Sequence, residues 1–433
     1  MQQTDRLGLG RLAAFSMPVV LFQTIELGWR AYLPAFLTQS VGLSFAMVGL
    51  LMVGARSLDS IADPVIGWLS DHWRTGYGQR KPWMIAGAPL ISAGALALFL
   101  APAGAGFAFV LAASLALHLG YSLIVTPHGG WALELSRDSH ERTRIMGAKV
   151  WFASAGAILT LAFLALLERR FGIDRIGLVS VIGVLIAVLA PASVLLVAVL
   201  FRERRDLLPS KDRTPLELLR EMAREPRLRI VLTLYLLGGG ADACSMGSFL
   251  FFAENLLGLQ GWGAGLLLIQ PALVLATLPV WSEVSRRIGR ERTLMAAYGW
   301  QMAMAPFGLL LPQGEMLVLA GYLMLRNLSY GVDYMLLRAM VADIADRDAT
   351  SEARSSGSYY ALTSITLKLA MGLGAATAVW AIGLSGFNGA QPLSETAGWT
   401  IRLVYCLLPA CAGGAGLALL AWARRERTSL RWA

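Results

Sequence analysis

Charged residues are scarce in this sequence. Of its 433 residues, 15% are Asp, Glu, Lys or Arg and 56% are hydrophobic, whereas a soluble protein of this size has about 25% charged residues. Runs of the ~20 apolar residues that a membrane-spanning helix needs recur along the whole chain. The short alternating pattern of a membrane β-barrel is absent from the sequence. The composition therefore predicts a polytopic helical membrane protein.

The sequence also has few cysteines and lacks the usual catalytic motifs. Cys244, Cys406 and Cys411 lie in apolar segments without disulfide or metal-ligand spacing, so packing is their expected role. We find no His/Cys cluster, no nucleotide-binding loop after a strand and no nucleophile elbow in the sequence. We therefore expect neither an enzyme nor a resident cofactor.

Twelve hydrophobic segments are expected to form helices. They lie near residues 11–37, 43–70, 83–101, 106–127, 147–167, 176–201, 229–257, 263–285, 293–311, 316–342, 357–384 and 399–423. The longest polar stretch falls at the midpoint and predicts three parts: an N-terminal six-helix bundle (1–201), a cytoplasmic central loop (202–228) and a C-terminal six-helix bundle (229–433). Two fused halves around a central substrate site are a common transporter plan.

A weak internal repeat supports this division. An acid-containing pair followed by a glycine and an arginine occurs at Ser70-Asp71 with Gly78 and Arg80, and at Ser282-Glu283 with Gly289 and Arg290. Both copies follow the second hydrophobic segment of their half, as a duplicated bundle requires.

The net charge of +9 is placed as in a membrane protein rather than a nucleic-acid-binding one. Basic residues gather in the short loops after even-numbered segments, and the loop with Arg169, Arg170 and Arg175 is the exception. By the positive-inside rule, both termini are predicted to lie in the cytoplasm and the chain in the cell inner membrane. The expected partners are a lipid bilayer and a small-molecule substrate, not nucleic acid, and a monomer is expected.

Three ionisable residues, Arg56, Asp59 and Asp63, lie inside the apolar segment 43–70. A charged side chain at mid-membrane costs roughly 3 kcal/mol or more. Asp59 and Asp63 are four residues apart, so on a helix they share one face about 6 Å apart. Two like charges that close in a low dielectric cannot both ionise without a counter-cation. The pair predicts a site for Na⁺ or H⁺; the alternative is a salt bridge with basic residues, although such buried pairs add little net stability.

The loop after this segment, DHWRTGYGQRKPW at 71–83, forms a motif with Arg56, Asp59, Asp63, Pro64 and Gly67. It resembles the glycoside–pentoside–hexuronide:cation symporters, the melibiose permease group. Further residues of the resemblance are Tyr121, Pro127, Glu134-Leu135-Ser136, Asp138, 140–144, Ala339-Met340, Asp343, Asp346, Glu352, Arg354, Gly357, Lys368 and Gly372. The resemblance implies the major facilitator fold: an all-α integral membrane protein with twelve transmembrane helices in two six-helix bundles. It also implies import driven by Na⁺, Li⁺ or H⁺.

The same resemblance assigns roles around the acid pair. It implies that Asp59 and Asp63 are the cation ligands, with Na⁺ as one candidate ion, and that Ser122 is a candidate third ligand. Lys368 matches the family lysine that approaches these carboxylates. Arg56 and Lys368 are the expected charge partners of the pair.

Two departures from the family concern the substrate. The melibiose permeases hold sugar hydroxyls with one aspartate on helix one and another on helix four, and the aligned residues here are Gln23 and Val125. Their loss argues against a galactoside. The candidates for substrate contact are Gln23, Glu26, Arg30, Tyr121, Val125, His128, Trp131, Lys149, Asp242 and Asp333. For the charged ones an ion pair with a neighbour stays open, such as Glu26 with Arg30, and for the aromatic ones helix packing.

Charged residues at the predicted cytoplasmic helix ends are candidates for a gate, because alternating access needs contacts that break and re-form. These are Asp71, Arg74, Arg80, Glu134, Asp138, Arg142, Asp343, Asp346 and Arg354. Static control of topology by the basic members is the alternative.

The favoured function is secondary active transport: symport of a small polar solute with Na⁺ or H⁺ by alternating access. The resemblance points to a sugar, glycoside or sugar acid. One alternative keeps the fold but carries an anionic or amphiphilic solute such as a lysolipid. The other is a non-transporting membrane receptor or scaffold, which retention of the costly residues Asp59, Asp63 and Lys368 argues against.

Overall fold

The computed structural model describes residues 7–73, 75–136, 138–203, 214, 216–217, 220, 224–259, 262–348, 356–387 and 393–425. Contacts group the chain into two compact units. The first unit comprises Met1–Glu221 together with Ile344–Leu362, and the second comprises Met222–Asp343 and Thr363–Ala433. A short piece of the second half of the sequence thus belongs to the first unit. The expected boundaries around 202–228 stay a prediction.

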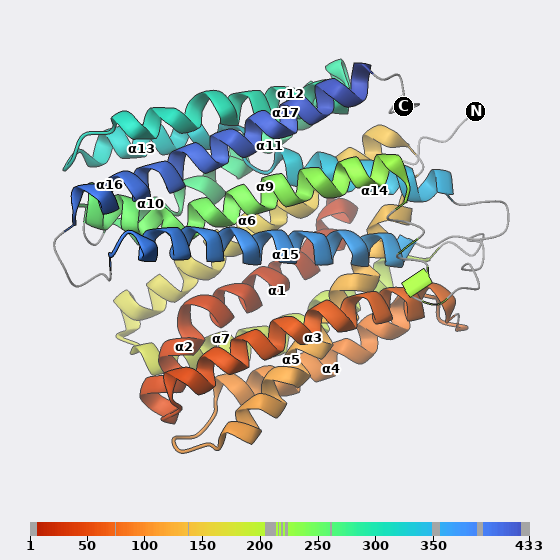
Figure 1. Cartoon of the computed structure of the whole chain (residues 1–433). Coiled ribbons are helices and arrows are strands. Elements are labelled where there is room, and N and C mark those ends of the chain that lie inside the picture. Colours follow the sequence, from red (N-terminus) through yellow and green to blue (C-terminus); the bar gives the residue numbers. More distant parts are fainter. Residues whose placement is uncertain are drawn as a thin grey trace. The chain divides into compact units, whose positions relative to one another are not determined.

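The first unit is a bundle of long helices (Figure 1). Its elements are α1 (Leu9–Leu27), η1 (Gly28–Tyr32), α2 (Leu33–Phe36), η2 (Leu37–Val41), α3 (Phe45–His72), α4 (Lys81–Phe99), α5 (Phe107–Glu134), α6 (Ser139–Phe171) and α7 (Arg175–Leu200). η1 and η2 are π-helical turns that prolong the first helix. α5 packs against both α3 and α4, and α1 packs against α6 and α7.

Glycines set the closest approach within this bundle. A Cβ added at Gly94 of α4 would lie 2.5 Å from the Leu117 backbone nitrogen of α5. One added at Gly120 of α5 would lie 2.7 Å from the Ile91 nitrogen of α4. Small residues allow helix backbones to touch in this way in membranes. The contact fixes α5, which carries most of the polar side chains discussed below.

The second unit is also helical, and two of its helices continue from or into the first unit. Its elements are α9 (Pro226–Leu250), η3 (Phe251–Leu256), α10 (Gly263–Leu266), α11 (Ile269–Ile288), α12 (Arg290–Met304), η4 (Ala305–Leu310), α13 (Met316–Arg326), η5 (Asn327–Ser329), α14 (Val332–Asp348), α15 (Ser356–Leu384), α16 (Glu395–Arg402), η6 (Leu403–Leu407) and α17 (Leu408–Arg425). The unit boundaries fall inside α14 and α15, the latter running as one long helix in Figure 1.

The apolar segment expected as one helix over 316–342 is broken. α13 ends at Arg326, and α14 starts at Val332 after the 3-10 turn η5. Tyr330 is extended and Gly331 has φ +85°. A positive φ is accessible to glycine at no steric cost, so Gly331 permits a break that another residue would resist. The break brings polar side chains of α13 and α14 into the interior of the second unit.

The described part of the chain contains helices suited to a bilayer. Eight of its helices are long and apolar enough to cross a membrane. Apart from the isolated bridge between Thr75 and Gly78, no β structure occurs among the described residues. The chain is therefore an all-α, multi-pass membrane protein, as its composition predicts.

Candidate functional site

The acid pair lies in the interior of the first unit. The Asp59 and Asp63 side chains on α3 are 0% exposed. Both face α5: His118 Nδ1 lies 3.2 Å from Asp59 Oδ1, and Thr126 Oγ1 donates to Asp63 Oδ1 over 3.2 Å. The two carboxylates are thus buried against one side of a neighbouring helix.

Ser122 lies between these two contacts on α5. His118, Ser122 and Thr126 are spaced by four residues, so they form one stripe, the α5 stripe, along the face toward α3. Ser122 Oγ is fully buried and makes no hydrogen bond to any described residue. A buried hydroxyl oxygen on α5, between the two residues that contact the carboxylates, is of the kind that hard cations bind.

The backbone of α3 adds a further oxygen. Pro64 lies inside the helix and has no N–H, so it cannot donate to the carbonyl of Ser60 four residues before it. That carbonyl belongs to the helical turn between Asp59 and Asp63. This stretch of α3 and the facing stretch of α5 therefore carry carboxylate, hydroxyl and carbonyl oxygens. This set suits Na⁺, and a single carboxylate suits H⁺.

His118 places an imidazole ring beside the acid pair. Its ring is buried and packs edge-on against Trp29 of η1 at 4.4 Å between centroids. Its Nδ1 points at Asp59, and its Nε2 makes no hydrogen bond to a described residue. Neither His118 nor Thr126 was predicted; their spacing of four from Ser122 was the available signal.

The expected charge partners of the acid pair stay predictions. The side chain of Arg56 lies outside the described part of the structure. Lys368 lies on α15, in the stretch of that helix that belongs to the second unit.

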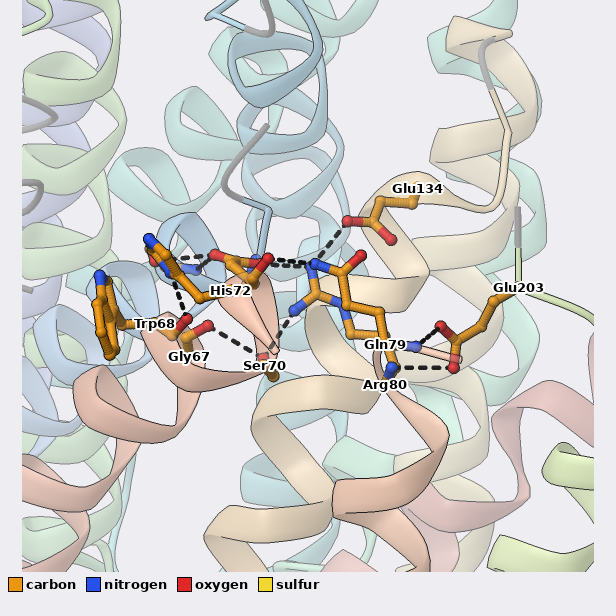
Figure 2. A network of polar contacts seen from close by, with 11 residues as sticks. Gly67, Trp68, Ser70, His72, Gln79, Arg80, Glu134 and Glu203 are labelled. Atoms are coloured by element: carbon orange, nitrogen blue, oxygen red, sulfur yellow. Dashed lines mark hydrogen bonds and ion pairs between the residues drawn. The ribbon is translucent and has the colours of Figure 1, made fainter. Parts of the chain in front are cut away.

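A second polar group, which we call the Arg80 network, lies where α3 ends and α4 begins (Figure 2). Arg80 Nη1 donates to Ser70 Oγ at 2.7 Å, and Nη2 donates to Asp71 Oδ1 at 2.5 Å and Glu134 Oε1 at 2.8 Å. All three charged side chains are buried. Burial disfavours the guanidinium cation, but the carboxylates of Glu134 and Asp71 outweigh it and raise the pKa of Arg80 above its ordinary value.

Asp71 also caps the start of α15. Its Oδ1 accepts from the Gly357 N–H, and its Oδ2 accepts from the N–H and hydroxyl of Ser358, each at 2.9 Å. A carboxylate at a helix N-terminus satisfies otherwise unpaired N–H groups and complements the helix dipole. Gly357 is needed here, because an added Cβ would lie 2.6 Å from Arg80 Nη1.

Glu203 plays the same part for α4. Its carboxylate accepts from three consecutive backbone N–H groups, those of Gln79, Arg80 (2.9 Å) and Lys81 (2.7 Å). Figure 2 shows Glu203 beside Gln79 and Arg80. Sequence reasoning missed Glu203 and Ser358, because only the folded bundle brings them to Asp71 and Arg80.

The other expected gate residues make separate contacts. Within the first unit, Arg142 pairs with Asp346 at 2.8 Å. Asp138 caps α6 by accepting from the Glu141 N–H at 2.7 Å. In the second unit, Asp343 pairs with Arg290. Arg74 and Arg354 lie outside the described residues.

The expected substrate residues of the first unit divide into polar and aromatic sets. Arg30 pairs with Glu26 at 2.8 Å while 53% of its side chain is exposed, and Gln23 on α1 is half-buried. The buried Lys149 lies over the ring of Tyr360 at 5.5 Å.

The aromatic candidates lie mostly within the packing of α1 against α5. His128 is fully buried, contacts the Phe15 carbonyl through Nε2 at 2.8 Å and stacks on the Phe15 ring. The buried Trp131 packs edge-on against the same ring, and Val125 is buried too. Tyr121 is half-buried against Phe22. All of these substrate roles stay predictions.

The two acids expected in the second unit line one cavity of about 80 Å³. Asp242 Oδ2 on α9 accepts from the hydroxyls of Tyr330 at 3.0 Å and Tyr334 at 3.1 Å, and Gln270 Nε2 lies 3.4 Å from its Oδ1. Asp333 is in the first turn of α14. Arg326, the last residue of α13, also lines the cavity.

Comparison with known proteins decides the family. Residues 14–423 match the family model described as MFS/sugar transport protein. The chain belongs to the glycoside–pentoside–hexuronide:cation symporter family of the major facilitator superfamily. Members of this family are transporters and not enzymes. A cation-coupled symporter of the sugar and glycoside class is thus identified at family level.

Several relatives from this symporter family align with most of the chain. A glucuronide carrier protein homolog of Escherichia coli K12 is 25% identical over 87% of this chain and 84% of its own. An isoprimeverose transporter of Lactiplantibacillus pentosus is 24% identical over 90% and 83%. An inner membrane symporter of E. coli K12 is 24% identical over 93% and 87%.

Solved structures confirm the major facilitator fold. A bacterial homologue of the iron transporter ferroportin superposes with a TM-score of 0.70 at 15% identity, covering 96% of this chain and 99% of its own. The E. coli fucose:proton symporter superposes with a TM-score of 0.69 at 14% identity, covering 96% and 98%. At such low identity the likeness concerns the fold alone.

Proposed function

We propose that this symporter imports a sugar or glycoside across the inner membrane together with Na⁺ or H⁺, which binds at Asp59 and Asp63. The observation that carries the proposal is the fully buried acid pair facing the α5 stripe. A cation or proton bound between two buried carboxylates one helical turn apart lowers their mutual repulsion. The names of the glucuronide carrier homolog and the isoprimeverose transporter support a glycoside cargo.

The Arg80 network supplies the element that moves. It ties α3, α4 and α5 to the start of α15 through charge-assisted hydrogen bonds. Such bonds are strong while buried and exchange readily for water once exposed. Alternating access requires contacts of this kind, which hold one state and are replaced in the other. Both ions and sugars are cargo in this scheme, and the protein supplies only the ligands and the gate.

The test is transport by the purified full-length protein in liposomes. Labelled glycosides are offered under an imposed Na⁺ gradient, a H⁺ gradient or none. We expect uptake above equilibrium with one of the two gradients. Asp59→Asn and Asp63→Asn should each abolish this accumulation, because either change removes one of the two charges that hold the ion.

A matched control is Asp174→Asn. Asp174 is not part of the acid pair. It caps α7 by accepting from the Gly177 N–H, and replacing its carboxylate should leave accumulation unchanged. Accumulation that persists in both Asp59→Asn and Asp63→Asn contradicts the site. If a lysolipid but no glycoside is accumulated, the cargo is a lysolipid instead. If no cargo is transported at all, the protein is a receptor rather than a transporter.

A further inference from the structure

The cavity of the second unit is lined by a hydrogen-bond acceptor, the Asp242 carboxylate, and by a hydrogen-bond donor, the Arg326 guanidinium. Two tyrosine hydroxyls fix Asp242 Oδ2, so its Oδ1 is left with the long 3.4 Å contact to Gln270. Each carboxylate oxygen accepts two hydrogen bonds, and this one therefore has capacity to spare. The carboxylate is oriented by the protein before any ligand arrives.

Arg326 provides the donor. Its Nη2 donates to Ser245 Oγ at 2.7 Å, and its guanidinium carbon lies 4.4 Å from the centre of the Tyr405 ring. Its Nη1 is fully buried and makes no hydrogen bond to a described residue. The Tyr322 hydroxyl, which donates to the Ala305 carbonyl at 2.9 Å, lies next to this guanidinium and can accept from it. A buried, unsatisfied guanidinium N–H is costly, and a ligand oxygen in the cavity would satisfy it.

We propose that this cavity binds the hydroxyl groups of the sugar, with Asp242 accepting and Arg326 and Gln270 donating. A hydroxyl both donates and accepts, so adjacent hydroxyls satisfy the carboxylate and the guanidinium at once. An anion would satisfy only Arg326, and an ammonium group only Asp242. The inference rests on the proposed glycoside transport and adds where the sugar is held.

The charge of the cavity favours a neutral cargo. It contains the carboxylates of Asp242 and Asp333 and the guanidinium of Arg326. When both acids are ionised, the single guanidinium leaves a net negative charge, which repels an added carboxylate. The size fits as well: one water needs ~10–15 Å³, so a cavity of about 80 Å³ accepts several hydroxyl-sized groups. The phosphate headgroup of a lysolipid matches neither the charge nor the size of this cavity.

This assignment also explains the missing acids of the first unit. Gln23 lies in the first helical span of the first unit and Val125 in the fourth, where the family resemblance expects aspartates. Asp242 and Asp333 lie in the first and fourth spans of the second unit. The hydroxyl-binding carboxylates thus occur in the equivalent spans of the other half.

The test is equilibrium binding by the purified full-length protein, which needs no coupling. The probes are p-nitrophenyl glycosides of glucose, galactose, xylose and mannose, and p-nitrophenyl β-D-glucuronide as the charged counterpart of the glucoside. We expect at least one neutral glycoside to bind more tightly than the glucuronide. Asp242→Asn and Arg326→Gln should each weaken that glycoside about tenfold to a hundredfold, as loss of a hydrogen bond to a charged group does.

The control is Glu315→Gln, which removes an exposed carboxylate just before α13 and should change nothing. If Asp242→Asn does not yield folded protein, Gln270→Ala takes its place, with an expected loss of about threefold to tenfold. If the folded cavity variants bind the glycoside with unchanged affinity, or if the glucuronide binds more tightly than every neutral glycoside, the cavity assignment is wrong while the proposed transport function stands. Absence of binding to every glycoside overturns the proposed cargo as well.

Discussion

The two units carry the same repeat but use it differently. In the first, Arg80 at the start of α4 pairs with Asp71 and with Glu134 at the end of α5. In the second, Arg290 at the start of α12 pairs with Asp343 in α14. Asp71 is buried and caps α15, whereas its counterpart Glu283 is exposed and pairs with arginines of its own helix. Both copies thus join separate helices through their arginine. Among the described contacts, the acid of the repeat reaches other helices in the first copy and stays within its own helix in the second.

The interior acids of the two units also differ in their surroundings. Asp59 and Asp63 are sealed against the α5 stripe, which offers hydroxyls and an imidazole. Asp242 and Asp333 border a cavity with tyrosines and an arginine. A sealed pair suits an ion that sheds its water, and a lined cavity suits a larger hydroxylated solute. In the proposed function, the first unit thus supplies the cation site and the gate, and the second unit holds the sugar.

The largest expected difference between the repeats concerns stability. Arg80→Ala leaves the buried Asp71 and Glu134 without their cation and should lower the free energy of unfolding by about 3–5 kcal/mol. Arg290→Ala leaves only Asp343, so its cost should be smaller. Denaturant or thermal unfolding of the purified protein in detergent measures both. Arg286→Ala, at an exposed ion pair, is the neutral control. Equal losses for Arg80 and Arg290 would remove the asymmetry between the repeats.

The next effect concerns the start of α15. Asp71→Asn weakens the hydrogen bonds to Gly357 and Ser358 that hold its first turn. Amide hydrogen exchange in 356–362 should become about tenfold faster, in line with the loss of a helix cap. Glu283→Gln, the matched change in the other repeat, should leave exchange unchanged. An unaltered rate in Asp71→Asn shows that other contacts hold α15.

Part of this organisation was predictable from the sequence. Asp59 and Asp63 stood out because lipid disfavours charge, and the charged helix ends followed from the repeat and the family motif. The confirmed family and fold follow from these residues. The acid pair is a local signal within one helical turn, whereas the repeat and the family motif are recognised by comparing separate stretches of sequence.

The partners of those residues were not predictable. Glu203 reaches Arg80 across 123 positions and Ser358 reaches Asp71 across 287. Finding His118 and Thr126 requires knowing which face of α5 meets α3, whereas the close packing at Gly94 and Gly120 concerns the face toward α4. The grouping of Arg326, Tyr330 and Asp242 required the helix break at Gly331. Each depends on tertiary packing that apolar periodicity does not specify.

The smallest expected effects come from removing one serine hydroxyl at each of the two interior sites. Ser122→Ala removes a buried oxygen of the α5 stripe and should weaken apparent affinity for the coupling ion about threefold to tenfold, the worth of one hydrogen-bond-strength contact. Ser245→Ala instead removes the acceptor of Arg326 Nη2, so it should weaken glycoside binding by a similar factor while ion affinity stays the same. Both are Ser→Ala changes inside a helix, so general effects on the bundle cancel in the comparison. Ion dependence of uptake and equilibrium glycoside binding measure the two affinities separately. If each variant lowers both affinities equally, cation and sugar share one site and the division of labour between the units is wrong.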